Sequence, residues 1–312
     1  MDENSARDAE IIQAEVVVEM PSGVPGVWQE VREVYPHRRW KWPLFLFLAT
    51  CWSTWYVGVP MAGRYEGFWS LFTNGLRYAV PVMTILICHE MGHFLQAWRY
   101  GVYASFPYFL PMPFSPLGTL GAVIAMEPRM GHRRALFDIG VSGPLAGLVP
   151  TMIFLIVGLQ RSTLGMPDGN EPIYGAPLLV QYLSEWILGP IPRGLVIHEH
   201  PMAFAGWVGL LITSLNLMPI GQLDGGHILY ALLRQNANRV ASLLLMLAVV
   251  VVALNISTLG SWMLMLFLLI VMGPTHPPTA NDEEPLGAFR TILGWLTLAF
   301  IFVGFTPTPI LQ

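Results

Sequence analysis

VASLLLMLAVVVVALNISTLGSWMLMLFLLIVMG, residues 240–273, begins a stretch that contains no Asp, Glu, Lys or Arg as far as Asn281. A hydrocarbon core about 30 Å thick takes roughly 20 helical residues to cross, so this stretch is long enough for two membrane spans. The turn-like sequence from Asn255 to Gly260 separates its two apolar halves. The stretch therefore predicts a transmembrane helical hairpin.

The composition carries the same signal across the whole chain. Hydrophobic residues make up 54% of the 312 positions and charged residues only 12%, against about 25% charged residues in soluble proteins. The 20 acidic and 16 basic residues are too few to cover a soluble domain of this size. The net charge of −4 includes no basic block for phosphates, which argues against nucleic-acid binding. Cys51 and Cys88 lie in separate apolar stretches and suggest no disulfide framework.

Further apolar windows of span length lie on both sides of the hairpin. Three of them contain no charged residue: 42–63, 139–160 and 291–312. Two more, 76–98 and 202–233, are interrupted by polar residues, and those interruptions are where chemistry is expected. The sequence predicts an all-α polytopic membrane protein with six to seven transmembrane helices.

The basic residues indicate an orientation. With a cytoplasmic N-terminus and seven crossings, twelve of the sixteen Lys and Arg residues fall on the inside, as the positive-inside rule requires. Residues 1–39 are polar and acidic, and we expect a flexible cytoplasmic tail there, before a membrane domain at 40–312. The start lacks the features of a signal or transit peptide. We expect a multi-pass protein of a prokaryotic cytoplasmic membrane, with an organellar membrane as the alternative.

Between the second and third spans, residues 103–128 do not have a helical pattern. Four prolines would break a helix there, whereas Gly118–Met126 has the composition of an extended segment. We predict a β-hairpin that dips into the membrane. Non-helical backbone at that depth is tolerated only against protein or a water-filled cavity, so the hairpin is expected to line a site.

The segment 76–98 contains His89-Glu90-Met91-Gly92-His93. Histidines four residues apart on a helix lie on one face, where both imidazoles can bind one metal ion. Glu90 lies off that face but can reach water at the metal without being a ligand. Glu and His are costly in a membrane span unless they are paired or bound to a metal. This cost favours a zinc hydrolase site over a polar pair that faces the bundle interior.

A catalytic zinc site usually has a third protein ligand and leaves one position for water. The candidate is Asp224, in the sequence NLMPIGQLDGG at 216–226, where Pro and Gly residues break the helix and let the carboxylate approach another helix. Alternatively, Asp224 caps a helix that begins at Gly225. Asp138 also competes for the role of ligand, although an interfacial salt bridge or cap suits it better. The cluster at 198–200, His-Glu-His, has a spacing that suits a helix-borne metal site poorly.

With these residues, the sequence resembles the site-2 protease family of intramembrane zinc metalloproteases. HEMGH in one apolar segment and NLMPIGQLDGG in another match the family's paired motifs, and the resemblance runs from about Trp40 to the C-terminus. It implies that His89, His93 and Asp224 bind one zinc ion per chain. It also implies that Glu90 is the catalytic base.

The resemblance further implies an activity, in which water activated by zinc cleaves a transmembrane segment of membrane-tethered substrates. Asn216 would contact the substrate or the oxyanion, and the segment Gly118–Met126 is similar to the family's membrane-dipping hairpin. The edge of that segment, with Gly118 and Gly121, would hold the extended substrate by strand addition. The expected partners are a transmembrane protein substrate and the lipid bilayer, and the active site is expected in the cytoplasmic half. The sequence indicates no oligomeric state.

Two other functions remain open. A membrane HExxH protease of the CAAX-processing type would need a downstream Glu ligand, and the candidates Glu127 and Glu171 lie in predicted loops. A zinc-binding or transport protein without hydrolysis would not require Glu90. The predicted outside loop, about 160–201, is too short for the PDZ domains that many bacterial members of the family insert there, so substrate gating by a PDZ domain is not expected.

Overall fold

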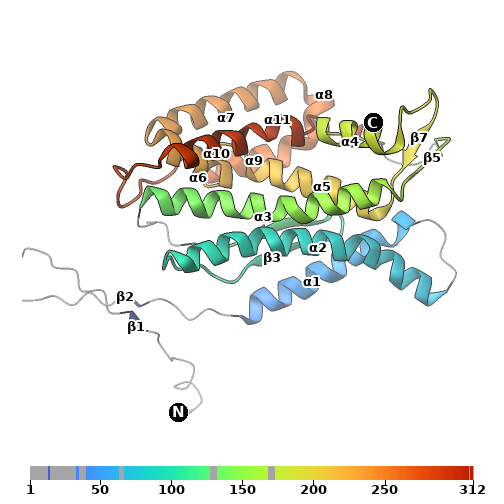
Figure 1. Ribbon diagram of the computed structural model, residues 1–312, viewed down its shortest axis with the longest axis horizontal. Coiled ribbons are helices and arrows are strands. Elements are labelled where there is room, and N and C mark those ends of the chain that lie inside the picture. Colours follow the sequence, from blue (N-terminus) through green and yellow to red (C-terminus); the bar gives the residue numbers. More distant parts are fainter. Residues whose placement is uncertain are drawn as a thin grey trace, which may run out of the picture.

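The computed structural model describes residues 40–62, 67–126, 132–167, 173–308 and 310–311, together with 13–14 and 33–34. The predicted tail, 1–39, falls almost entirely outside the described residues, as do Glu127 and Glu171. The described part is mainly helical, as the sequence predicted, and its longest helices lie roughly side by side (Figure 1).

The elements follow one another along the chain with short connections. The helices are α1 (Lys41–Gly58), α2 (Phe68–Arg99), α3 (Arg133–Leu159), α4 (Leu178–Leu188), α5 (Pro201–Asn216), α6 (Asp224–Leu233), α7 (Asn236–Leu254), α8 (Ile256–Leu259), α9 (Met263–Met272), α10 (Ala288–Ala299) and α11 (Ile301–Gly304), with 3₁₀ turns η2 (Pro60–Ala62) and η3 (Gly260–Trp262). The strands form antiparallel pairs, which are β1 (Gln13–Ala14) with β2 (Glu33–Val34), β3 (Tyr108–Met112) with β4 (Gly118–Val123), β5 (Thr163–Gly165) with β7 (Val196–His198), and β6 (Ile173–Tyr174) with β8 (Ile310–Leu311).

Among the described residues, three helices are long and apolar enough to cross a membrane: α2, α3 and α7. Shorter apolar helices occupy other predicted spans, namely α5, α9 and the α10–α11 pair. The 202–233 window is split between α5 and α6, and the 240–281 window between α7 and α9, with the break at the predicted turn. Three helices could therefore cross a membrane by their length and composition, while the number of six to seven spans remains a prediction.

Helix α3 lies between α2 and α5 and packs against α2, α5 and α6 (Figure 1). Glycines allow the close approach. A Cβ at Gly92 of α2 would meet the backbone oxygen of Ser142 in α3, and a Cβ at Gly206 of α5 would meet Leu155. In a bilayer the hydrophobic effect does not drive helices together, and small residues at the interface let their backbones pack closely instead. This packing brings the polar side chains of α2 next to α3 and α6.

The predicted hairpin between α2 and α3 is present as β3 and β4, with an irregularity between Phe109 and Pro111. Its turn is fixed to neighbouring helices, because Ser53 of α1 donates its Oγ–H to the carbonyl of Gly118 (2.6 Å) and Tyr78 of α2 donates its O–H to Leu117 (2.7 Å). Thr119 donates to the carbonyl of Leu110 across the pair (3.0 Å). The β-hairpin is thus confirmed as a structural element, and its depth in a membrane remains a prediction.

The break between α5 and α6 depends on glycine. Gly221 has a φ of +60°, which side-chain-bearing residues rarely adopt. A Cβ at Gly225 would meet the backbone oxygen of Leu217, and one at Gly226 would meet that of Gly221. The returning chain therefore folds onto the first turn of α6, and this places Asp224 at the start of that helix.

Candidate metal centre

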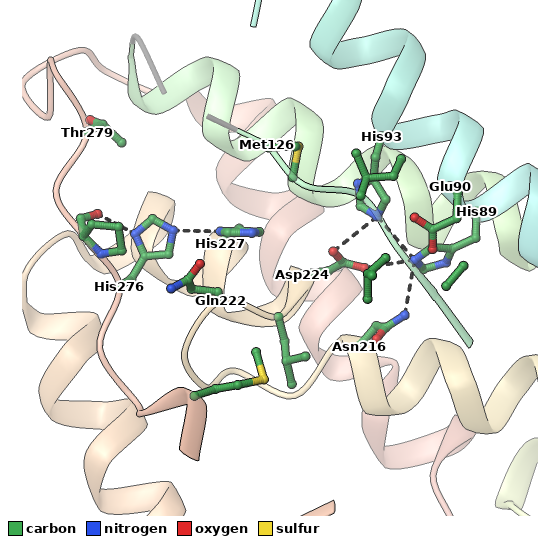
Figure 2. A pocket seen from close by; sticks show the side chains of 16 residues that line it. His89, Glu90, His93, Met126, Asn216, Gln222, Asp224, His227, His276 and Thr279 are labelled. Atoms are coloured by element: carbon green, nitrogen blue, oxygen red, sulfur yellow. Dashed lines mark hydrogen bonds and ion pairs between the residues drawn. The ribbon is translucent and has the colours of Figure 1, made fainter. Parts of the chain in front are cut away.

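Three side chains from two helices converge at the centre of the bundle (Figure 2). Nε2 of His89 lies 3.1 Å from Oδ2 of Asp224, and Nε2 of His93 lies 3.2 Å from Oδ1 of the same carboxylate. The two histidine Nε2 atoms are 3.3 Å apart. Both histidines are buried, with 3% and 4% of their surfaces exposed.

The hydrogen bonds of His93 show why these atoms can bind a cation. Its Nδ1–H donates to the backbone oxygen of Ile139 in α3 (2.8 Å), and a carbonyl can only accept. In the neutral ring Nε2 then carries a lone pair, which faces a carboxylate oxygen of Asp224 and the second imidazole. Electron-rich atoms at such distances need a proton or a cation between them. A backbone carbonyl that fixes the tautomer of a metal-binding histidine is a usual arrangement.

The donor set and its spacing fit zinc. Nitrogen and oxygen ligands lie about 2.0–2.1 Å from Zn²⁺, so two ligands of a tetrahedral site are about 3.3 Å from each other. The two histidine Nε2 atoms are 3.3 Å apart, and each lies 3.1–3.2 Å from a different oxygen of Asp224. With one ligand atom taken from each residue, all three atoms lie within 4.8 Å of one another, close enough to hold one ion. Two imidazoles and one carboxylate leave the fourth position for water, as in catalytic zinc sites.

The structure also decides between the roles open to the two aspartates. Asp224 is the first residue of α6 and not its N-cap, which is Leu223, and its carboxylate lies against His89 and His93. Asp138 of α3 accepts two hydrogen bonds from Arg290 of α10, both 2.8 Å, and one from the hydroxyl of Tyr100. Asp138 therefore ties α10 to α3, as the salt-bridge interpretation predicted, and only Asp224 meets the histidines.

Two further candidate residues lie beside these ligands. Glu90 is buried, with 4% of its surface exposed, and lines the same cavity, with its carboxyl group next to His89 (Figure 2). Asn216, the last residue of α5, places Nδ2 3.3 Å from Nε2 of His89. The arrangement thus brings a carboxyl group and an amide N–H donor next to three side chains that could hold a metal ion.

A cavity of about 210 Å³ gives access to this centre. Its lining includes the end of β4 and the residues after it, together with the end of α9 and the connection to α10. The lining residues are His89, Glu90, His93, Ala122, Val123, Ile124, Met126, Asn216, Gln222, Leu223, Asp224, His227, Met272, His276, Pro277 and Thr279. Gly118 and Gly121 lie on the same strand but are not part of this lining, and Gly118 packs against Thr54 of α1.

The cluster at 198–200 has a structural role. His200 is the N-cap of α5, and its Nδ1 accepts the backbone N–H of Met202 (3.2 Å). Ser162 accepts the backbone N–H of His200 (3.0 Å). Among the described residues, the group able to hold a metal is His89, His93 and Asp224, and the 198–200 cluster is not part of it.

Sequence reasoning missed one residue that positions the centre. A Cβ at Gly143 of α3 would overlap the imidazole of His93 at Nε2, Cδ2 and Cε1. Gly147, one turn later, lies against His89, with a Cβ distance of 3.1 Å. The spacing of small residues on α3 was the available signal, and only the packing of α3 on α2 shows that it makes room for the ligands.

Comparison with known proteins identifies the family. The profile of Peptidase family M50 matches residues 77–256, more than half of the chain, and this range includes the three side chains that could hold a metal ion. The chain belongs to peptidase family M50. The resemblance drawn from HEMGH and the LDGG segment is thereby confirmed, and the metal centre is that of a zinc metalloprotease family.

The relatives carry the same description. The chain is 29% identical to "Probable zinc metalloprotease EGY1, chloroplastic" of Arabidopsis thaliana over 89% of this chain and 55% of that protein. It is 31% identical to the EGY1 protein of Oryza sativa subsp. japonica over 70% of this chain and 38% of that protein. For "Probable zinc metalloprotease EGY2, chloroplastic" of Oryza sativa subsp. indica the identity is 30%, over 71% of this chain and 41% of that protein. No solved structure shows a significant match.

These matches set two limits. The chain spans about half the length of these relatives or less. The relatives are named chloroplastic, so they give no support to the expectation of a prokaryotic cytoplasmic membrane over an organellar one.

Proposed function

We propose that this chain is an intramembrane zinc metalloprotease that cleaves a transmembrane segment of membrane-tethered proteins. The observation that carries the proposal is the convergence of three metal-binding atoms and one buried carboxyl group on a cavity inside an apolar helical bundle. A zinc transporter would need metal ligands along a path, whereas here Glu90 lies beside a single trio as a hydrolase requires.

Each side chain around the centre has a distinct role in the proposed peptide hydrolysis. Zinc held by His89, His93 and Asp224 would polarise a carbonyl group and acidify water. The carboxylate of Glu90 takes the proton of the attacking water and delivers it to the nitrogen of the leaving amine. Asn216 donates an Nδ2–H to the carbonyl oxygen as negative charge develops on it. Burial of these groups strengthens each interaction, because little water competes with them.

The substrate must reach this cavity as an extended chain, because the carbonyls of an intact helix are hydrogen-bonded and shielded. We propose that it adds as a strand to the exposed edge of β4, which ends in the cavity wall at Ala122 and Val123. Among the described residues β4 belongs to a two-stranded sheet with β3, so its other edge has no strand beside it, and its side chains Leu120 and Val123 are half exposed. Gly118 and Gly121 would serve as the Cβ-free part of that edge, next to the cavity rather than in it.

We further propose the orientation that the basic residues favour, with the N-terminus and the cavity toward the side that carries most of the Lys and Arg residues. The partners are then the bilayer and a single-span or multi-span protein substrate.

The test combines zinc content with cleavage of a single-span model protein in detergent. We expect Glu90→Gln to keep about one zinc per chain and to lose cleavage, and Asp224→Ala to lose both. Asp138→Asn is the matched carboxylate control and is expected to keep zinc and cleavage. Zinc in the wild type without cleavage of any of several single-span substrates would overturn the protease proposal, and full activity of Glu90→Gln would overturn the role of the base.

A further inference from the structure

A second pair of histidines lines the cavity on the side of α6 and of the α9–α10 connection. His227, three residues after Asp224, and His276 are both buried, each with 8% of its surface exposed. Nδ1 of His227 lies 2.7 Å from Nε2 of His276. Figure 2 shows the ring of His227 between His276 and Asp224, so its second ring nitrogen, Nε2, is on the side of the metal centre.

The hydrogen bonds of His276 determine which atoms carry the protons. Its Nδ1–H donates to the backbone oxygen of Pro277 (2.6 Å), because a carbonyl can only accept. Burial lowers the pKa of His276, which keeps the ring neutral near pH 7. The lone pair is then on Nε2, and His227 must donate its Nδ1–H to it. The neutral ring of His227 consequently has its own lone pair on Nε2.

This chain of hydrogen bonds is built rigidly into the fold. Asn238 of α7 accepts the backbone N–H of His276 (2.8 Å) and donates to its carbonyl (3.3 Å). The ring of Tyr230 stacks on His276 with centroids 4.6 Å apart, and its hydroxyl donates to Asp282 (2.8 Å). These contacts hold His276 in the position from which its Nε2 meets Nδ1 of His227.

Nε2 of His227 is a hydrogen-bond acceptor at the cavity. Within the part of the chain that the structure describes, Nδ1 is the atom through which His227 makes its hydrogen bond, and no bond of Nε2 is seen. An acceptor at this place faces whatever donor occupies the space between β4 and the α9–α10 connection.

The proposed binding mode supplies such a donor. A strand that adds to β4 pairs one of its edges with β4 and leaves the N–H and C=O groups of its other edge without a partner from β4. The same cavity is lined by α6 and the α9–α10 connection, which can supply partners for that second edge. Backbone groups without a partner are costly where water is scarce, so this second edge needs acceptors and donors of its own.

We propose that Nε2 of His227 accepts a hydrogen bond from a backbone N–H on the far edge of the extended substrate, and that His276 is a positioning residue that holds His227 in the accepting tautomer. This inference rests on the proposed function, because it needs a peptide in the cavity. It differs from the metal centre in its residues and in its chemistry, since the recognised group is a peptide N–H.

The experiment is an ester scan of a single-span substrate, in which one peptide N–H at a time is replaced by oxygen along the residues around the cleaved bond. Binding of the dye-labelled peptides is measured on Glu90→Gln, which is expected to retain zinc, and cleavage is measured on the wild type. We expect one ester position to weaken binding on the order of 3- to 10-fold, as for the loss of one neutral hydrogen bond. The His227→Leu variant is expected to bind the all-amide peptide more weakly by the same factor. In that variant, the ester at the sensitive position is expected to cause no additional loss of affinity.

Two additional variants separate positioning from folding. His227→Gln, whose side-chain oxygen can accept at the same place, is expected to restore most of the affinity. His276→Phe keeps the ring that stacks on Tyr230 but removes the acceptor for His227. Nitrogen NMR of ¹⁵N-histidine-labelled protein is expected to show His227 protonated at Nδ1 in the wild type and a shift toward Nε2 protonation in His276→Phe, with zinc content unchanged.

The outcomes are distinct. If the wild type cleaves the substrate but no ester position depends on residue 227, or if His227 is protonated at Nε2 in the wild type, the inference is wrong and the protease proposal stands. If zinc-loaded protein neither binds nor cleaves any single-span peptide, the proposed function fails first and this inference falls with it.

Discussion

Replacing Gly143 by alanine tests how closely α3 packs against the metal centre. The added Cβ would overlap the imidazole of His93 at Nε2, Cδ2 and Cε1. To recover an ordinary van der Waals separation of roughly 3.5 Å, the ring would have to retreat by about 1 Å or more. Metal–ligand bonds tolerate displacements of only about 0.2 Å. The His93 ligand would therefore be lost, and with it the hydrogen bond from Nδ1 to Ile139.

We expect Gly143→Ala to reduce zinc affinity on the order of 100-fold or more, since loss of an outer hydrogen bond alone costs 10- to 100-fold. The matched control is Gly147→Ala, whose Cβ would lie 3.1 Å from Cβ and 3.2 Å from Nδ1 of His89 and needs a shift of only a few tenths of an ångström. This control is expected to stay within about tenfold of the wild type.

The assay measures zinc per chain by atomic emission after equilibration with a chelator of known affinity, and circular dichroism confirms that the helices of both variants remain. Wild-type zinc affinity in a folded Gly143→Ala variant would refute the reasoning, because it would mean that His93 has room to move and that α3 does not hold the ligand in place.

Other predictions follow from the same structure. Asp138→Asn is expected to destabilise the protein by about 1–3 kcal/mol, because Arg290 loses a paired, partly buried carboxylate, and thermal unfolding in detergent measures this while zinc content stays constant. Gly225→Ala places a Cβ against the backbone oxygen of Leu217 and is expected to abolish zinc binding by displacing the start of α6. Zinc binding by this variant would contradict the close packing of the α5–α6 connection on the first turn of α6. Burial raises the pKa of Glu199 to about 7, well above its unfolded value of about 4.3. The folded state then binds the proton more tightly than the unfolded state between these values, so stability falls as pH rises through that window. Glu199→Gln is accordingly expected to raise the melting temperature at pH 8 but not at pH 4, and a pH-independent effect would contradict the assignment.

The sequence alone determined the class of the protein and most of the metal centre. Charge-free windows of span length predict membrane helices because charged groups are costly in hydrocarbon. The four-residue spacing of His89 and His93 needs only a helix to put both rings on one face. Pro219 and the glycines on both sides of Asp224 predicted a helix break, and the structure has that break between α5 and α6.

Only the tertiary structure decided which carboxylate meets the histidines and what surrounds them. Asp138 and Asp224 both begin apolar helical stretches, and nothing local shows that Arg290, far along the chain, pairs with Asp138. The pairing of His227 with His276 likewise joins α6 to a connection that follows α9. Local sequence determines helix faces and helix breaks because both depend on residues that are neighbours in the chain. Contacts between distant segments depend instead on how the helices pack, and that packing depends on the shape of each helix surface along its full length.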